Sequence, residues 1–449
     1  MTKHFHSRRT FLGTMAKAGA VAATAPLIVP RRVLGGSGYQ APSDTVNVAA
    51  VGIGGMGKEN LKHITGHNIV ALCDVDWDFA APVFEAYPEA ARYVDYRRMF
   101  DERGEEIDGV VIATPDHTHA LITLAAMERG LHVYTQKPLT WSIWEARQLQ
   151  KAAKRYDVVT QMGNQGRSSD GMRLLKEHIK AGTIGEVREV HIWTNRPIWP
   201  QGIKMPEILK RKPEELDWDL WLGPAPEIAY DPAFHPFAWR GWVPFGTGAQ
   251  GDILPHEMAY PYWALDLGAP VTVETRSTDF NGDSYPAASM TSYDFPAGGN
   301  RPPVRISWYD GGLKPATPEG WPEDQPLRPG GTLYVGSKGM YLDDKEPQFI
   351  SNGSGNPLPE VPRLFERIAG ESHEMNWVRA IQGLEEATSP FSFAGPLTEA
   401  FLLGIVSMRA GNRMIHWDSE NMQVTNLPEA NRYLRRQDPR EGWELPAIT

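Results

Sequence analysis

The chain has one cysteine, Cys73, among its 449 residues. A single cysteine cannot form an intrachain disulfide bond, so a disulfide framework is excluded. It also cannot supply the set of thiolates that a Cys-ligated metal site needs. The fold must therefore be stabilised by hydrophobic cores, and a chain of this length is expected to form two domains.

An excess of basic residues is also lacking. The chain has 45 Lys and Arg residues against 55 Asp and Glu residues, and its formal net charge is -10. A protein that binds the phosphate backbone of DNA or RNA needs a basic face. Nucleic acid is therefore not an expected partner.

A long uninterrupted apolar run is missing as well. Residues 11–29 are the only candidate membrane segment in the sequence, but they contain Lys17, Pro26 and several glycines and alanines. Residues 7–12, Ser-Arg-Arg-Thr-Phe-Leu, precede this segment in the order typical of a twin-arginine export signal. A frayed helix with a chance Arg pair is the alternative. We expect residues 1–43 to be a signal peptide and linker, read by the twin-arginine export machinery. The mature protein is then expected in the periplasm or outside the cell, with no stable membrane span.

The first half of the chain alternates short apolar segments with stretches of helical length. The apolar segments are rich in Val, Ile, Leu and Ala, which is typical of parallel strands buried on both faces. They cover residues 46–53, 68–73, 109–113, 131–135 and 158–162. This pattern predicts a Rossmann domain with a doubly wound parallel sheet over residues 44–165.

The texture changes after about residue 165. Trp, Pro and Gly become frequent, and residues in the apolar segments alternate between polar and apolar, which indicates antiparallel strands. These segments cover residues 187–194, 271–279, 289–295 and 304–309, followed by a Pro- and Gly-rich excursion over 310–330 and helical spacing over 371–382 and 397–412. We predict a C-terminal α+β domain over residues 166–430 with a large, mostly antiparallel open sheet, and a tail over residues 431–449. The fold class is therefore α/β.

A glycine-rich turn follows the first predicted strand in the pattern G-x-G-x-x-G. In this context the first glycine permits a tight turn, the second lets the backbone approach a pyrophosphate, and the following helix offers its N-terminal N–H groups to the anion. Asp74 ends the second strand, where a carboxylate can bind the adenine ribose; it favours NAD over NADP because it repels a 2′-phosphate. A glycine turn with an unrelated aspartate is the alternative. The cofactor-binding residues expected here are Gly52, Ile53, Gly54, Gly55, Met56, Gly57 and Asp74.

Polar residues follow the next three predicted strands. Carboxyl ends of parallel strands lie at one edge of the sheet, where open α/β sheets bind ligands. The residues expected to border the nicotinamide are Thr114, Pro115, His119, Gln136, Lys137 and Gln165. For Lys137 alone, a surface lysine is the alternative. His117, His119, Asp252 and His256 lack further ligands at recognisable spacing, so a metal site is not expected.

Three motifs follow one another along the chain: the glycine fingerprint, residues 113–119 (A-T-P-D-H-T-H) and residues 136–140 (Q-K-P-L-T). In this order they resemble the glucose-fructose oxidoreductase, inositol dehydrogenase and rhizopine-catabolism family, Gfo/Idh/MocA. The resemblance implies that Lys137 lies at the substrate and the nicotinamide. The family usually has Glu-Lys-Pro, and here Gln136 replaces the glutamate. That replacement removes a carboxylate near the cofactor and leaves the charge partner of Lys137 undefined.

A second family motif, a Gly-rich turn followed by Asp and His, is matched by residues 248–256 (G-A-Q-G-D-I-L-P-H). The i, i+4 spacing puts Asp252 and His256 on one helical face, within reach of one substrate hydroxyl. Histidine is suited to accept that hydroxyl's proton near neutral pH. Asp252 would orient His256 or bind a neighbouring hydroxyl. The alternative is a helix-capping aspartate with a structural histidine.

The segment after residue 192 offers groups that suit a polyhydroxylated ligand. Trp193 has a flat apolar face, and Asn195 and Arg196 have hydrogen-bonding groups for hydroxyls. We expect these three residues, with Asp252 and His256, to bind substrate. His235, Trp239 and Trp242 are expected to form a lid or to pack the site.

These features together predict an exported NAD(P)-dependent oxidoreductase with a tightly bound nicotinamide. It would move hydride to or from a secondary alcohol of a sugar, glycoside or cyclic polyol, with Lys137 polarising the oxygen and His256 acting as general acid/base. A periplasm has no dependable NAD pool, so the cofactor would be regenerated on the enzyme by a second substrate. The alternatives are a redox-assisted glycosidase or lyase and a non-catalytic dinucleotide- or sugar-binding protein. The family resemblance implies a homodimer or homotetramer.

Overall fold

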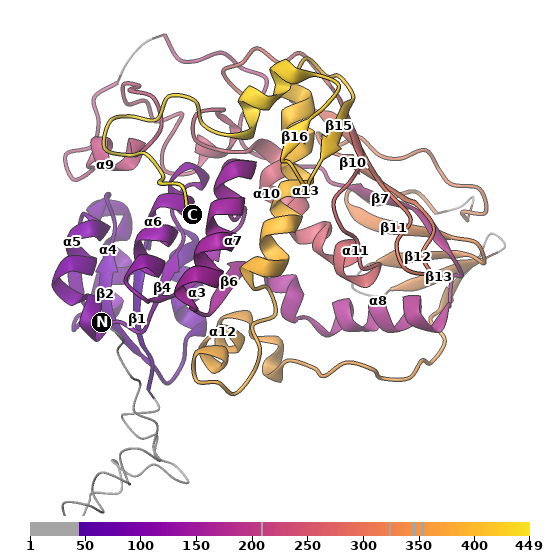
Figure 1. Cartoon of the computed structure of the whole chain (residues 1–449), viewed down its shortest axis with the longest axis horizontal. Coiled ribbons are helices and arrows are strands. Elements are labelled where there is room, and N and C mark those ends of the chain that lie inside the picture. Colours follow the sequence, from indigo (N-terminus) through magenta and orange to yellow (C-terminus); the bar gives the residue numbers. More distant parts are fainter. Residues whose placement is uncertain (1–44, 208–209, 323–324, 344–346, 352–353) are drawn as a thin grey trace, which may run out of the picture. The chain divides into compact units, whose positions relative to one another are not determined.

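Figure 1 shows the computed structural model of the chain. It describes residues 45–449 apart from 208–209, 323–324, 344–346 and 352–353. The predicted signal peptide and linker, residues 1–43, lie outside the described residues.

The first sheet contains six parallel strands in the order β3-β2-β1-β4-β5-β6. This is the strand order of a Rossmann fold, and the direction of progression reverses between β1 and β4. The sequence pattern does not predict the short strand β3, but the predicted parallel sheet is confirmed. The strands are β1 (Asn47–Val51), β2 (Asn68–Cys73), β3 (Ala91–Tyr93), β4 (Gly109–Ile112), β5 (His132–Gln136) and β6 (Thr160–Gly163).

Helices connect these strands and continue into the second half of the chain. They are α3 (Met56–His63), α4 (Trp77–Ala86), α5 (Tyr96–Arg103), α6 (Asp116–Glu128), α7 (Ile143–Tyr156), α8 (Asp170–Ala181), α9 (Trp218–Leu222), α10 (Gly248–Glu257), α11 (Ala259–Ala264), α12 (His373–Ile381) and α13 (Phe391–Arg409). Short 3₁₀ turns are η2 (Gly104–Glu106), η3 (Gln165–Ser168), η4 (Ala238–Gly241), η5 (Ala369–Glu371) and η6 (Pro428–Leu434).

Side chains of β1 alternate between two helical layers. Ala49 and Val51 belong to a core shared with α6 and α7, and Val48 and Ala50 belong to a core shared with α3, α4 and α12. Successive strand residues point to opposite faces of a sheet, so a strand covered on both faces needs apolar residues throughout. The near-continuous apolar runs of the sequence have this cause.

The second sheet contains ten strands in the order β14-β13-β12-β11-β7-β10-β9-β8-β15-β16. Only the central β7/β10 pair is parallel, which confirms the predicted, mostly antiparallel sheet. The strands are β7 (Val187–Trp193), β8 (Thr272–Ser277), β9 (Ser289–Phe295), β10 (Val304–Tyr309), β11 (Gly331–Gly336), β12 (Met340–Asp343), β13 (Gln348–Ser351), β14 (Ser354–Pro357), β15 (Ile415–Asp418) and β16 (Gln423–Val424).

Helix α13 is the one helix of the described chain that is long and apolar enough to cross a membrane by length and composition. However, 83% of its apolar window is buried inside the protein. It packs against α7, α10 and β8. Its apolar composition is therefore that of a core helix.

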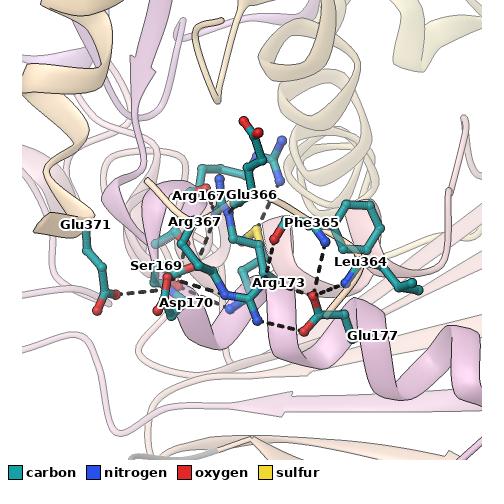
Figure 2. A network of polar contacts seen from close by, with 12 residues as sticks. Arg167, Ser169, Asp170, Arg173, Glu177, Leu364, Phe365, Glu366, Arg367 and Glu371 are labelled. Carbon is teal, nitrogen blue, oxygen red and sulfur yellow. Dashed lines mark hydrogen bonds and ion pairs between the residues drawn. The ribbon is translucent and has the colours of Figure 1, made fainter. Parts of the chain in front are cut away.

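Residues 358–371, here called the strap, join β14 to α12 and cross α8 (Figure 2). The carboxylate of Glu177 on α8 accepts hydrogen bonds from the strap amides of Leu364, at 2.8 Å, and Phe365, at 3.2 Å. It also forms a two-pronged pair with Arg367, whose Nη1 and Nη2 lie 2.8 and 2.7 Å from its oxygens. Hydrogen bonds to this carboxylate, first from Arg367, lower the pKa of Glu177 to about 2. The strap thus fixes where α12 begins.

The chain after η6 returns to the first sheet. Figure 1 shows this segment in yellow beside α7. The amide of Ile448 donates to Gln148 Oε1 of α7 at 2.7 Å, and Arg97 of α5 stacks on Trp443. The segment predicted as a tail is therefore packed on the Rossmann sheet's helices.

Candidate active site

A cavity of 520 Å³ lies at the carboxyl ends of β1, β2, β4 and β5. We call it the glycine-loop cavity. Its wall is formed by the glycine turn after β1, by Asp74, by Thr114 and Pro115, and by Gln136 and Lys137. It therefore occupies the edge where the sequence predicts a cofactor.

The glycine turn has the geometry that its sequence demands. Gly52 has φ +79°, and a Cβ there would lie 2.7 Å from the Thr114 amide nitrogen. A Cβ on Gly57 would lie 2.3 Å from the Gly52 carbonyl oxygen. No side chain caps α3, so amides of its first turn remain available to an anion. The turn thus fits a dinucleotide's pyrophosphate.

Members of the fingerprint divide into two groups. Gly52, Gly54, Gly55 and Met56 line the cavity, whereas Ile53 is fully buried and does not. Gly57 packs α3 against the turn and also lies behind the wall. The turn's backbone and the small glycines, rather than its apolar side chain, therefore face a ligand.

Asp74 is held by the backbone of the same turn. Its Oδ2 accepts from the amides of Ile53, at 2.8 Å, and Gly54, at 3.0 Å, and its Oδ1 accepts from Asp76 at 3.0 Å. Burial raises the pKa of Asp74, and these three N–H groups partly oppose that effect. The carboxyl group lines the cavity in a fixed position.

Thr114 and Pro115 line the cavity as predicted, but His119 does not. The His119 ring is buried, 2.7 Å from the carbonyl oxygens of both Thr114 and Pro138. Burial lowers the pKa of His119 to about 4. The structure thus places His119 behind the cavity wall and not at the position predicted to border the nicotinamide. It sits one helical turn into α6, points inward, and joins the loops that carry Thr114 and Lys137.

The charge partner of Lys137 is Asp252. Its Nζ lies 2.7 Å from Asp252 Oδ1 and donates to the Asp252 carbonyl oxygen at 2.8 Å. Arg240 Nε approaches the same Oδ1 at 3.2 Å. Burial alone would raise the pKa of Asp252, but the charges of Lys137 and Arg240 outweigh it and hold that pKa below its ordinary value. Two cations share one carboxylate, which leaves net positive charge at this end of the cavity.

Gln136 belongs to a buried relay. Its Nε2 donates to Asn60 Oδ1 at 2.9 Å, and Asn60 Nδ2 donates to Glu374 Oε1 at 2.7 Å. Tyr134 also donates to Glu374, at 3.2 Å. A Cβ on Gly163 of β6 would lie 2.7 Å from the Gln136 amide group, so glycine makes room for it. The carboxylate that the resemblance places at 136 is replaced in this network by Glu374 of α12.

A second cavity, of 370 Å³, shares Lys137, Asp252 and Arg240 with the first. We call it the lysine cavity. His256 and Arg196 line it, and so does Gln165, whose Nε2 lies 3.5 Å from Tyr134 Oη. Gln165 therefore borders this cavity rather than the glycine-loop cavity.

The i, i+4 spacing on α10 does bring Asp252 and His256 to one wall. Asp252 binds Lys137 and Arg240, however, and does not hydrogen-bond to His256. Among the described residues, the His256 ring has no hydrogen-bond partner. Burial, then the charge of Lys137, lowers the pKa of His256 to about 3. The ring is therefore neutral at neutral pH, and neither of its nitrogens is engaged by another described residue.

The predicted substrate residues separate in space. Arg196 lines the lysine cavity, whereas Asn195 is exposed and lines none of the described cavities. Trp193 is 2% exposed, donates from Nε1 to the Arg328 carbonyl at 2.8 Å, and lines a different cavity. Alternation along β7 and the turn after it sends these neighbours to different places, which the sequence alone does not reveal. Trp199, which the sequence does not single out, lines the lysine cavity instead.

The segment predicted as a lid or as packing has two residues in the cavity wall and one buried away from it. His235 and Trp239 line the glycine-loop cavity, and Trp242 is buried in a separate aromatic cluster. Asp76 Oδ2 accepts a hydrogen bond from His235 Nε2 at 2.7 Å, and each side chain is only 8% exposed. This contact connects the segment to the N-terminus of α4, where Asp76 also caps the helix.

The part of the chain that the structure describes contains no cluster of metal-ligating side chains. No group of three His, Cys, Asp or Glu side chains there could hold a metal ion.

Two family models match the chain. One, described as an oxidoreductase family with an NAD-binding Rossmann fold, matches residues 46–164. The other, described as the C-terminal alpha/beta domain of that oxidoreductase family, matches residues 187–299. Together they cover just over half of the chain. The chain belongs to the Gfo/Idh/MocA oxidoreductase family.

Curated relatives match part of the chain. Inositol 2-dehydrogenase of Salmonella typhimurium is 30% identical over 156 residues, which are 33% of this chain and 45% of that protein. A glycosyl hydrolase family 109 protein of Shewanella pealeana is 28% identical over 202 residues, 40% of this chain and 44% of its own length. The chain thus spans about half the length of the curated relatives it matches.

Solved structures resemble the fold over most of the chain. The WlbA dehydrogenase from Bordetella pertussis, in complex with NADH and UDP-GlcNAcA, has a TM-score of 0.59 at 16% identity, covering 83% of this chain and 99% of that chain. At this identity the likeness concerns the fold alone. The Gfo/Idh/MocA Rossmann domain binds NAD, and the glycine turn and Asp74 are the residues of this chain that would hold it.

Proposed function

We propose that this protein is an NAD-dependent oxidoreductase that removes hydride from a secondary alcohol of a sugar, glycoside or cyclic polyol. One observation carries the proposal. Lys137, Asp252 and Arg240 stand in the wall shared by the glycine-loop and lysine cavities, and His256 lines the lysine cavity but not the glycine-loop cavity. A substrate in the lysine cavity would therefore meet both a cation for its oxygen and a base for its proton.

The residues divide the chemistry of the oxidation between them. The carbon–hydrogen bond of the alcohol breaks with transfer of hydride, and the hydroxyl oxygen develops negative charge as it becomes a carbonyl. Bound NAD supplies the hydride acceptor. The Lys137 ammonium, held by Asp252, donates a hydrogen bond to the oxygen, and Arg240 adds positive charge. Neutral His256 accepts the hydroxyl proton, so the products are a ketone, reduced cofactor and protonated histidine.

The proposal includes export and a retained cofactor. The twin-arginine pattern supports export, and the lid contact between His235 and Asp76, with Trp443 in the cavity wall, supports retention. A retained cofactor is regenerated on the enzyme, either by reducing a second sugar or by returning hydride to the oxidised substrate. The second route would permit a transient ketone to assist elimination or glycoside cleavage. One relative's name, glycosyl hydrolase family 109 protein, favours including that route.

The test uses full-length protein purified from the periplasmic fraction. Denaturation should release a dinucleotide, and sugars, glycosides or inositols should change the near-ultraviolet absorbance of the native protein's nicotinamide. Lys137→Ala should retain the dinucleotide and lose the absorbance change. Lys154→Ala, on the exposed face of α7, is the matched control and should behave as the wild type. An unaltered absorbance change in Lys137→Ala would remove Lys137 from the mechanism. A protein without dinucleotide would overturn the proposal.

A further inference from the structure

A third cavity, of 460 Å³, adjoins the lysine cavity. We call it the acidic cavity, because Glu257 at the end of α10 and Asp343 at the end of β12 line it. His256 lines both this cavity and the lysine cavity. The His256 side chain is therefore a wall that the two cavities share.

Among the described residues, the two carboxyl groups have no cationic partner. Neither Glu257 nor Asp343 forms an ion pair there, and Glu257 accepts only from Thr332 Oγ1 at 3.3 Å. Burial raises the pKa of both groups, and the neighbouring Glu257 helps raise the pKa of Asp343 to about 7. Both residues remain partly exposed and line the cavity. Their hydrogen-bonding capacity is therefore open to a ligand there.

The remaining wall suits a sugar ring. Trp193 and Tyr260 contribute aromatic rings, and Gly330 and Gly331 contribute backbone. Flat rings can pack on the apolar face of a pyranose while carboxyl groups accept hydrogen bonds from its hydroxyls. The volumes of the acidic and lysine cavities both lie in the range of about 300–1,000 Å³ typical of small-ligand sites.

We propose that the acidic cavity binds a second sugar ring through its hydroxyl groups, so that the substrate is a disaccharide or larger glycoside whose oxidised ring occupies the lysine cavity. This inference rests on the proposed function for the placement of the oxidised ring. His256 stands at the junction of the two rings.

The experiment compares matched sugars on the protein with its bound cofactor. The probes are glucose against cellobiose and maltose, and galactose against lactose, with half-saturation read from the nicotinamide absorbance. At least one disaccharide should half-saturate at about tenfold lower concentration than its monosaccharide, a difference of about 1.4 kcal/mol, because the second ring adds hydrogen bonds to the carboxyl groups. Glu257→Gln and Asp343→Asn, made singly and together, should reduce that advantage and leave monosaccharide half-saturation unchanged. Glu189→Gln, at an exposed carboxyl on β7, should change neither.

Two further measurements keep the inference falsifiable. Dinucleotide content and thermal unfolding show whether each variant has folded, and the comparison uses the variants that have. Equilibrium binding of the same sugars to Lys137→Ala protein separates binding from redox chemistry. Tighter disaccharide binding without any cofactor reduction would support the subsite and sink the proposed function. Equal binding of mono- and disaccharides, or equal weakening of both by the variants, would overturn the subsite.

Discussion

Replacing Gln136 by glutamate, the residue that the family resemblance places there, should destabilise this protein. The Gln136 amide donates to Asn60 Oδ1, and the Asn60 amide donates to Glu374. A carboxylate at 136 would confront the Asn60 oxygen; if the Asn60 amide turned over, its oxygen would confront Glu374 instead. Either arrangement puts two acceptors 2.7–2.9 Å apart, and both Gln136 and Glu374 are only 4% exposed. An unsatisfied buried polar group costs about 1–3 kcal/mol, more when it is charged, so we expect Gln136→Glu to cost about 2–4 kcal/mol.

Chemical denaturation of the wild type and the variant measures this cost. The penalty should shrink as the pH falls, because the introduced carboxyl, once protonated, can donate to Asn60 as the amide does. The double variant Gln136→Glu with Glu374→Gln reverses the direction of the relay and satisfies Asn60 again. It should lie within about 1 kcal/mol of the wild type, which gives a large coupling energy. A neutral Gln136→Glu variant, or additive effects in the double variant, would refute the reasoning.

Three other perturbations test the site and the fold. Asp252→Asn removes the carboxylate between Lys137 and Arg240 and should lower the free energy of unfolding by about 3–5 kcal/mol, measured by chemical denaturation. An unchanged free energy of unfolding would show that the two cations do not need this carboxylate. His235→Ala removes the hydrogen bond to Asp76 and should speed dinucleotide release about tenfold, because a hydrogen bond to a charged group contributes about 1.5–3 kcal/mol. Stopped-flow displacement measures the release rate, and an unchanged rate would contradict this role of His235. The pKa of Glu177 is lowered from 4.5 to about 2, so in that window the unfolded chain binds a proton that the folded protein does not. Stability from the Glu177 contact is therefore present above pH 4.5 and lost as the pH falls toward 2. Glu177→Gln should flatten this acid dependence in urea titrations, and an unchanged pH profile would exclude the contact as its cause.

Local patterns were enough to predict the parts of the site that neighbours in sequence determine. The glycine turn depends on positions a few residues apart, and Asp252 and His256 share a wall because a helix repeats every 3.6 residues. Lys137 follows a buried strand, and strand ends of a parallel sheet meet at one edge.

Contacts between residues far apart in the sequence could not be predicted from local patterns. Glu374 reaches Asn60 over 314 positions, and no local signal marks it as the end of the Gln136 relay. Arg240 joins Asp252 from a 3₁₀ turn that carries no recognisable pattern. The sequence predicts a substrate contact for Trp193 but not the cavity that it lines, because a strand residue's face depends on its neighbours in the sheet; it lines the acidic cavity. Such placements need the packed structure.

The place of Trp443 in the glycine-loop cavity orders events during synthesis. One wall of this cavity is made by Gly52 and its neighbours, and another by a residue almost 400 positions later. A ribosome must therefore release nearly the whole chain before the pocket is enclosed, whereas the Rossmann strands can pair much earlier. We therefore expect the dinucleotide to bind late in folding, and a chain that ends before Trp443 to bind it less tightly.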